Sequence, residues 1–210
     1  MRTLRLWLAP FLVVVAVMGT LAYFYLGAML DPNGNLREFP MAIVNQDTGD
    51  VMPGSDEPKN LGAQITQGIL DGIDPERIDM QPMGIAAANG GLDNGTLYGA
   101  IVIPSDFTKR VSILAQASVI PGDIEKPIIT LYTNPRLGAY AKGIVTTIGD
   151  QALGTVNRSV GEELTRTVTE TLAETAPDLQ LSGASSLTLE QPINVLTVEH
   201  RPLPDVTGSG

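Results

Sequence analysis

The chain contains one histidine, His200, and a search for catalytic chemistry starts there. His200 stands beside Arg201 and Pro202, a context that does not favour a Ser/His/Asp triad. Zinc would require further ligands of a kind that Asp and Glu alone seldom supply, and the sequence has no cysteine. We therefore expect His200 to be an exposed histidine with no catalytic partner.

Motifs for nucleotide and acyl-transfer chemistry are absent from the sequence. It contains neither a G-x-x-x-x-G-K-[ST] loop nor a G-x-S-x-G elbow, and no glycine directly precedes a lysine. The stretch 208–210 (GSG) lacks the strand–turn–helix context of a phosphate loop. We expect no catalytic residue, no cofactor and no metal site, so the chain is predicted not to be an enzyme.

The charge of the chain limits its partners. The formal net charge of −10 at pH 7 argues against nucleic acid, because phosphate contacts need clustered Lys and Arg. It argues equally against a domain that lies flat on anionic lipid. We interpret the excess of Asp and Glu as a solvated surface.

The element that positions everything else is an apolar run at residues 6–30 (LWLAPFLVVVAVMGTLAYFYLGAML), which carries no charge. As a helix it would reach about 37 Å, enough to cross a hydrocarbon core of about 30 Å with membrane lipid around it. Trp7 and the aromatic group at 23–25 mark its two ends. A cleavable signal peptide would have a shorter apolar core and an A-x-A site. We predict an uncleaved transmembrane anchor.

Charges around the span predict its orientation. Arg2 and Arg5 are the only charged residues before it, so the positive-inside rule puts the N-terminus in the cytoplasm. Of 13 Lys and Arg, the other 11 follow together with all 23 Asp and Glu, which gives residues 31–210 a formal net charge of −12. We expect that part to be extracytoplasmic. Small residues at 16, 19 and 20 would permit the span to pack against other membrane helices or in a homo-oligomer.

Beyond the anchor, apolar runs of strand length alternate with helical patterns. This alternation favours an α/β domain with a mixed, partly parallel sheet and a long helix. Strands are predicted at 39–45, 78–82, 98–103, 127–132 and 192–199. Helices are predicted at 60–73, at 84–91 before a turn at 92–96, from an N-cap at Ser105, and over 136–176.

The long helix over 136–176 poses a packing question. Its apolar residues recur every four positions from Ile144 to Leu172, and four residues turn 400°, so the row winds about 40° per step. One flat face cannot bury such a row. Either the helix bends, with Gly154 or Gly161 as hinge, or its two halves pack on different surfaces. A lever or self-association surface and two consecutive core helices both fit this pattern.

Three stretches follow the span in a fixed order: 41–49 (MAIVNQDTG), 98–108 (YGAIVIPSDFT) and 131–134 (LYTN). Together with the span they resemble the YhgE/Pip family (phage infection protein), membrane proteins related to type-2 ABC-transporter permeases. The residues that carry the resemblance are Asn45, Asp47, Gly49, Pro104, Asp106, Phe107 and Asn134. Turn-forming residues after a strand, and Pro-Ser-Asp at a strand-to-helix junction, shape the backbone, so we interpret this set as structural and not as a ligand site.

The resemblance implies an organisation and a role. Residues 1–30 would be the transmembrane anchor with a short cytoplasmic tail, 31–200 the extracytoplasmic α/β domain, and 201–210 a linker toward a further membrane segment. The chain would then be the non-enzymatic first span and outer domain of an export permease that a separate ATPase subunit powers. The alternative is a single-pass surface interaction protein on which phage, envelope or secretion-system partners dock. A secreted enzyme or solute-binding domain would need cleavage near Ala28.

Overall fold

The computed structural model describes residues 16–21, 23, 36–53, 55, 57–117, 125–175 and 189–201. The chain divides into two compact units, Met1–Arg37 and Glu38–Gly210. In the first unit, residues 16–21 and 23 are helical. Within the described ranges, no helix combines the length and apolarity that a membrane crossing requires. Most of the predicted span at 6–30 lies outside the described residues.

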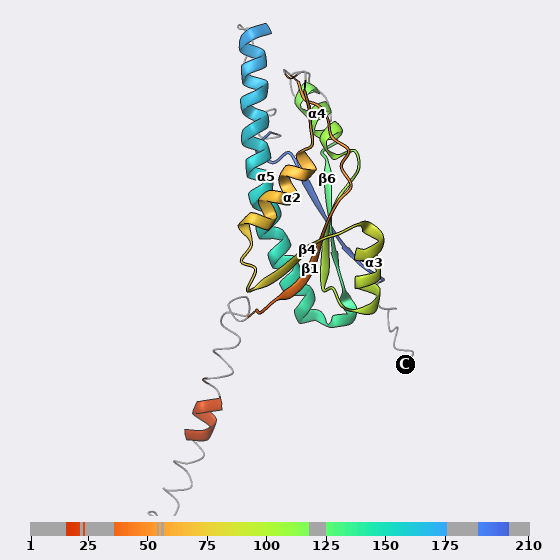
Figure 1. The fold of residues 1–210 in the computed structure, drawn as a ribbon. Coiled ribbons are helices and arrows are strands. Elements are labelled where there is room, and N and C mark those ends of the chain that lie inside the picture. The colour runs from red at the N-terminus through yellow and green to blue at the C-terminus, as the bar shows by residue number, and fades with distance from the viewer. Residues whose placement is uncertain are drawn as a thin grey trace, which may run out of the picture. The chain divides into compact units, whose positions relative to one another are not determined.

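The second unit is built on a five-stranded sheet in the order β4-β1-β5-β6-β7 (Figure 1). β1 pairs in parallel with both β4 and β5, β5 pairs antiparallel with β6, and β6 pairs in parallel with β7. The strands are β1 Phe39–Asn45, β4 Ile78–Pro82, β5 Gly99–Ile103, β6 Ile128–Thr133 and β7 Asn194–Glu199. A separate hairpin joins β2 Asp50–Val51 to β3 Pro58–Lys59. The predicted mixed sheet is confirmed.

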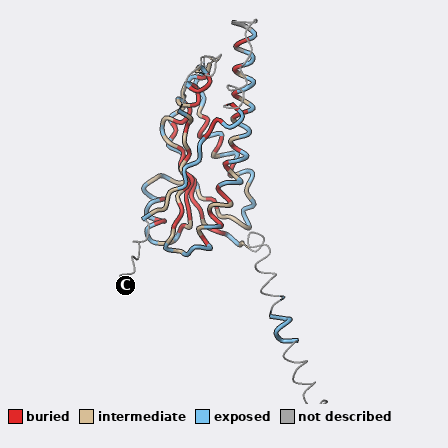
Figure 2. Tube along the Cα trace, turned by 180° about the vertical axis from the view of Figure 1, so that it is seen from behind, coloured by how far each residue is buried: buried red, intermediate tan, exposed pale blue. Residues whose placement is uncertain are grey.

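The helices cover the two faces of the sheet unequally. They are α2 Leu61–Gly72, α3 Ile85–Asn94, α4 Phe107–Ala117, the short η1 Pro135–Leu137, and α5 Ala139–Thr175. α2 and α5 lie on the opposite side of the sheet from α3 (Figure 1). The α3 side is lined by small strand residues such as Ala42, Val44 and Ala100. Both faces of β1 and β5 are therefore buried, as the red central strands in Figure 2 show.

The predicted long helix is present as α5, a single element of 37 residues. Its first half lies on the sheet, where a Cβ at Gly149 would come within 2.4 Å of the Leu131 side chain. Its second half holds the segment before β7, because the Asn157 side chain bonds both the N–H and the C=O of Ile193, at 3.0 and 3.1 Å. The two halves thus pack on different surfaces, which is one of the two alternatives that the winding apolar row allowed.

The order and direction of the strands bring the two ends of the domain to one edge of the sheet. Met41 of β1 pairs with Gly99, Gly99 with Thr133, and Thr133 with Glu199, so these residues form one row across four strands. β1 starts two residues before this row and β7 ends on it. We call this end of the strands the base edge. At the opposite edge, which we call the far edge, β1 and β5 end at the paired residues Asn45 and Ile103.

Some predicted bounds are wrong. α3 runs to Asn94, so residues 92–94 are helical and not a turn; Gly95, with φ of 77°, ends the helix. α4 begins at Phe107, and Ser105 precedes it by two residues and is not its N-cap. The hairpin of β2 and β3 was not predicted, because strands of two residues leave no periodic pattern in the sequence.

Candidate functional site

The residues that carry the family resemblance do not form a single site. Asn45 ends β1 at the far edge and five others follow β1 or β5 there, whereas Asn134 follows β6 at the base edge. Within the far-edge group, the carboxylate of Asp47 is the centre. Asp47 is 8% exposed, and its oxygens accept four hydrogen bonds. We call Asp47, Asn60, Gly62 and Thr108 the Asp47 hub.

The Asp47 hub ties the turn after β1 to the first turns of two helices. Asp47 Oδ2 accepts from the Gly62 N–H of α2 at 3.0 Å, and Oδ1 accepts from the Thr108 N–H of α4 at 3.1 Å. The Thr108 hydroxyl also donates to Asp47 Oδ2 and accepts from the Leu61 N–H at 2.9 Å. A carboxylate is favoured at helix N-termini, where N–H groups are unpaired and the helix dipole is positive. Asp47 therefore takes the capping role predicted for Ser105.

Asn45, Asn60 and Gly49 shape the backbone around the hub. Asn45 Oδ1 accepts from the Asp47 N–H at 2.9 Å, and Gly49 donates to Asp47 Oδ1 at 3.3 Å with a φ of 75°. The Asn60 side chain bridges, since its Nδ2 donates to the Asp47 carbonyl at 2.8 Å and its Oδ1 accepts from the Ala63 N–H at 2.7 Å.

The close packing of the hub depends on Gly62. A Cβ at this position would lie 2.5 Å from Asn45 Oδ1 and 2.6 Å from the Asp47 Cβ. Helix α2 can therefore approach the turn only because residue 62 has no side chain.

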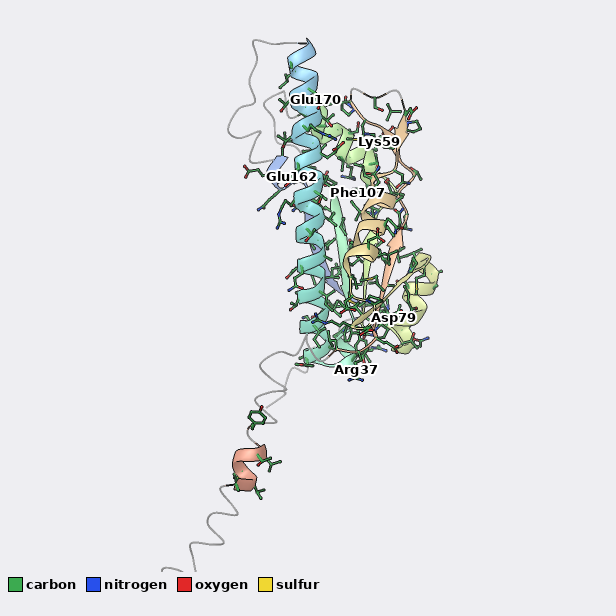
Figure 3. All side chains as sticks on the ribbon, turned by 60° about the vertical axis from the view of Figure 1, so that its left-hand side comes forward. Arg37, Lys59, Asp79, Phe107, Glu162 and Glu170 are labelled. Atoms are coloured by element: carbon green, nitrogen blue, oxygen red, sulfur yellow. The ribbon has the colours of Figure 1, made fainter. Side chains whose placement is uncertain are left out.

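The junction between β5 and α4 holds the next three residues of the set. The Pro104 carbonyl accepts from the Phe107 N–H at 3.2 Å, and the Phe107 side chain is fully buried. Figure 3 shows Phe107 beside α5, below Lys59. Asp106 pairs with Arg110 at 2.7 Å, and its side chain is 43% exposed. The junction thus buries its apolar member and leaves its carboxylate on the surface.

Asn134 anchors a different part of the domain. It is 1% exposed, and its Nδ2 donates to the Leu92 carbonyl at 2.7 Å and more weakly to the Leu97 carbonyl at 3.4 Å. Its Oδ1 accepts from the Arg136 N–H at 3.2 Å, and its own N–H donates to the Tyr98 carbonyl at 3.0 Å. Asn134 therefore joins the C-terminal end of α3 to the end of β6.

His200 is less exposed than expected, and it has a hydrogen-bond partner. Its side chain is 15% exposed, and Nε2 lies 2.7 Å from Asp93 Oδ1. The ring also meets Tyr132 edge-on, with centroids 6.3 Å apart. The neighbouring Arg201 Nη2 donates to the other oxygen of Asp93 at 2.8 Å. We call Asp93, His200 and Arg201 the exit latch.

Hydrogen bonding within the exit latch and nearby positive charge lower the pKa of Asp93. The hydrogen bond from His200 is the largest cause, and burial of the carboxyl opposes it; the charges of Arg201, His200 and Arg136 act in the same direction as the hydrogen bond. The carboxylate is therefore ionised at neutral pH. No nucleophile belongs to this group, so the latch is an ion pair and not a triad.

The described part of the chain shows no candidate metal site, and its polar clusters are not part of the groove that the structure contains. No cluster of three or more His, Asp or Glu there could hold a metal ion. A groove of 630 Å³ runs along the second half of α5 and is open to solvent. Its lining mixes both signs of charge: Arg158, Gly161, Glu162, Thr165, Arg166, Thr169, Glu170 and Glu190.

The residues that bond to Asp47 and to His200 were harder to predict from the sequence than Asp47 and His200 themselves. Thr108 stands in the stretch 98–108 that carries the resemblance, so a signal for it existed. Gly62 follows the N-cap Asn60 and could be suspected from that spacing. Asp93 is separated from His200 by 107 residues, and no local pattern connects the two.

These features define a mixed α/β domain whose polar clusters are satisfied internally. A family model described as "Protein of unknown function (DUF3533)" matches residues 9–210, and the chain belongs to that family. The chain is also 26% identical over 172 residues to the "Uncharacterized protein YhgE" of Bacillus subtilis (strain 168). That match covers 82% of the chain and 20% of the relative, so the chain spans about a fifth of that protein's length. The resemblance to the YhgE/Pip family is confirmed.

Among solved structures, the chain is similar to a domain of a candidate ABC type-2 transporter from Thermotoga maritima MSB8. The sequences are 16% identical, and the alignment covers 78% of this chain and 88% of that one with a TM-score of 0.40. A likeness of this size does not define a shared fold.

Proposed function

We propose that this chain is the first transmembrane span and the extracytoplasmic domain of a YhgE-like membrane protein. Residues 1–30 form the anchor with a cytoplasmic N-terminus, 31–200 form the outer domain, and 201–210 lead toward a further membrane segment. The domain serves an export permease of the type-2 ABC class, and a separate ATPase supplies the energy. The chain itself carries no catalytic centre, and its motif residues hold the fold together.

The base edge of the sheet is the observation that supports this proposal best. A domain inserted between two membrane spans must receive and return the chain on the same side, and β1 starts where β7 ends. The two strands are three positions apart in the sheet, or about 14 Å at about 4.8 Å per strand. Packed helices lie about 8–10 Å apart, and a seven-residue connection such as 31–37 spans up to about 23 Å. Two neighbouring spans could therefore flank the domain.

A sheet in which β7 ran in the other direction would not bring the two ends of the domain to the same edge. If β7 ran antiparallel to β6, the chain would leave at the far edge, about 20 Å away along a strand of six residues. It would then need a long return segment to reach the same membrane.

The absence of cysteine from the sequence makes the topology directly testable. Single variants Thr3→Cys and Tyr140→Cys are made in the full chain, and intact cells are treated with a membrane-impermeant maleimide. Tyr140 is 60% exposed in the outer domain, so its variant should be labelled in intact cells. The Thr3 variant should be labelled only after lysis. Labelling of Thr3→Cys from outside, or recovery of a soluble chain that lacks its first 30 residues, would refute the topology.

The ATPase partner is tested separately from the topology. Mild detergent extraction of the full chain, followed by affinity capture and mass spectrometry, should recover an ABC-type ATPase subunit. Capture from cells that express a variant without residues 1–30 serves as the control. If both preparations recover the same proteins, the interaction does not depend on the membrane segment and the permease assignment fails.

A further inference from the structure

The backbone is unusual at the two ends of the domain. Among the described residues, Glu38 and Arg201 are the non-glycine residues with positive φ, at 46° and 48°. Glu38 directly precedes β1, and Arg201 follows β7 by two residues. A left-handed backbone is unfavourable for a residue with a Cβ and persists only where surrounding contacts hold it. Both residues with positive φ lie at the base edge, where the chain enters β1 and leaves β7.

The exit latch holds Arg201 in this conformation. Both oxygens of Asp93 are engaged, one by His200 Nε2 at 2.7 Å and the other by Arg201 Nη2 at 2.8 Å. The His200 N–H donates to the Thr133 carbonyl at 2.8 Å and so extends the pairing of β6 and β7 by one residue. Three separate hydrogen bonds therefore fix the last two described residues to α3 and β6.

Backbone bonds hold the other end. The Glu38 N–H donates to the Glu76 carbonyl at 3.0 Å, and the Phe39 N–H donates to the Arg77 carbonyl at 3.0 Å. The Phe39 ring stacks on Tyr98 with centroids 4.3 Å apart. These contacts tie the start of β1 to the turn before β4 and to the residue that precedes β5.

The charges around the latch come from several elements. Asp93 belongs to α3 and faces His200, Arg201 and the positive charge of Arg136 on η1. Lys142 of α5 pairs with Glu199, the last residue of β7. The end of β7 is thus linked by ion pairs to helices on both faces of the sheet.

We propose that the exit latch fixes the direction in which the chain leaves β7, and that it alone keeps Arg201 in the left-handed conformation. The end of β7 and the C-terminal end of α3 then move together as one part of the domain. That the flanking segments are membrane spans rests on the proposed function; the latch itself is a property of residues 38–201.

Hydrogen–deuterium exchange on the full chain in detergent tests the latch. Asp93→Asn should speed exchange in peptides that cover 194–201 by about tenfold and leave β1 and β5 unchanged, since an amide replaces the charge on which both bonds depend. Asp71→Asn is the matched control, because Asp71 is an exposed acid with one hydrogen bond, from Gln67 at 2.7 Å. Unchanged exchange at 194–201 in Asp93→Asn, or faster exchange throughout the domain, would overturn the proposal.

A second pair of variants tests the backbone conformation. Arg201→Ala and Arg201→Gly both remove the guanidinium group, but only glycine adopts a left-handed backbone without steric cost. If the latch holds this conformation, exchange at 194–201 should be about tenfold slower in the glycine variant than in the alanine variant. Equal exchange in the two would show that the left-handed conformation is not maintained.

Neither exchange experiment depends on the membrane. Failure of the labelling experiment would remove the flanking spans and leave the latch intact. Failure of both exchange comparisons would remove the latch and leave the topology intact.

Discussion

The Asp47 hub and the exit latch are built from the same chemistry at opposite edges of the sheet. In each, one carboxylate uses both oxygens to join elements that are distant in sequence. They differ in burial and in the kind of donor. Asp47 is buried and accepts from backbone N–H groups of α2 and α4 and from the Thr108 hydroxyl, whereas Asp93 is exposed and bonds two other side chains.

This difference in burial predicts a difference in what each cluster does. Water cannot replace a lost acceptor at the far edge, so the buried N–H groups of the Asp47 hub would remain unsatisfied. At the base edge, water can replace Asp93 at little cost to folding. We infer that the hub maintains the stability of the domain and that the latch controls local geometry.

The largest effect is expected from Asp47→Ala. The substitution leaves the buried N–H groups of Gly62 and Thr108 without an acceptor, and it should lower the free energy of unfolding by about 3–5 kcal/mol. Urea unfolding of the full chain in detergent, followed by circular dichroism, measures it. Asp50→Ala is the control, because Asp50 lies in β2 and its carboxylate accepts from the N–H of its own neighbour, Val51, at 2.8 Å.

A loss below about 1 kcal/mol for Asp47→Ala would contradict the role of the hub and remove the contrast with Asp93. Asp47→Asn sharpens the comparison, because the amide keeps the shape of the carboxylate but presents an NH₂ group to one pair of donors. We expect it to lie between the wild type and the alanine variant.

A smaller effect is expected from Gly62→Ala, with Gly68→Ala on the same helix as the matched control. A Cβ at Gly62 would meet Asn45 and Asp47 at 2.5–2.6 Å, so the substitution should cost about 1–3 kcal/mol. A Cβ at Gly68 would meet nothing within 4 Å, and alanine is the better helix former there, so that variant should gain about 0.5–1 kcal/mol. Equal effects of the two substitutions would show that α2 does not depend on close approach to the hub.

The sequence predicted the elements whose signals are local. The strand at 39–45 and the helix after Asn60 are examples, since apolar runs and an N-cap are adjacent residues in the chain. The long helix was also predicted, and its four-residue row left open either a bend or two packing surfaces, of which the structure shows the second. These signals need no knowledge of what lies across the fold.

The partners of each cluster could not be predicted in the same way. Asp47 and Thr108 are 61 residues apart, and Asp93 and His200 are 107 apart. Ser105 is a residue type that often caps helices. In the structure, however, the Thr108 N–H of α4 donates to Asp47, which lies in the turn after β1. Capping by a distant residue leaves no trace in the local spacing, so the sequence indicated a nearby cap.

The smallest effect on folding is expected from acid titration of Asp93, and it separates the two clusters most clearly. The hydrogen bond from His200, assisted by the charges of Arg201 and Arg136, lowers the pKa of Asp93 below 3.8. A lowered pKa means that the folded state favours the carboxylate. The contribution of Asp93 is therefore complete above about pH 4 and is lost as the pH falls through the lower folded value.

The measurement compares the wild type with Asp93→Asn at pH 3 to 7, as protection of the 194–201 amides after correction for intrinsic exchange. The difference between the two chains should be constant from pH 7 to 5 and decrease progressively below about pH 4, as the pH falls toward the lowered pKa of Asp93, because protonation makes the wild-type carboxyl as neutral as the amide. β5 peptides report whether the domain as a whole is opening. A difference that declines between pH 7 and 5 would assign control of the latch to another titrating group. A difference that stays undiminished down to the pH at which the β5 peptides open would show that shape, and not charge, holds the end of β7.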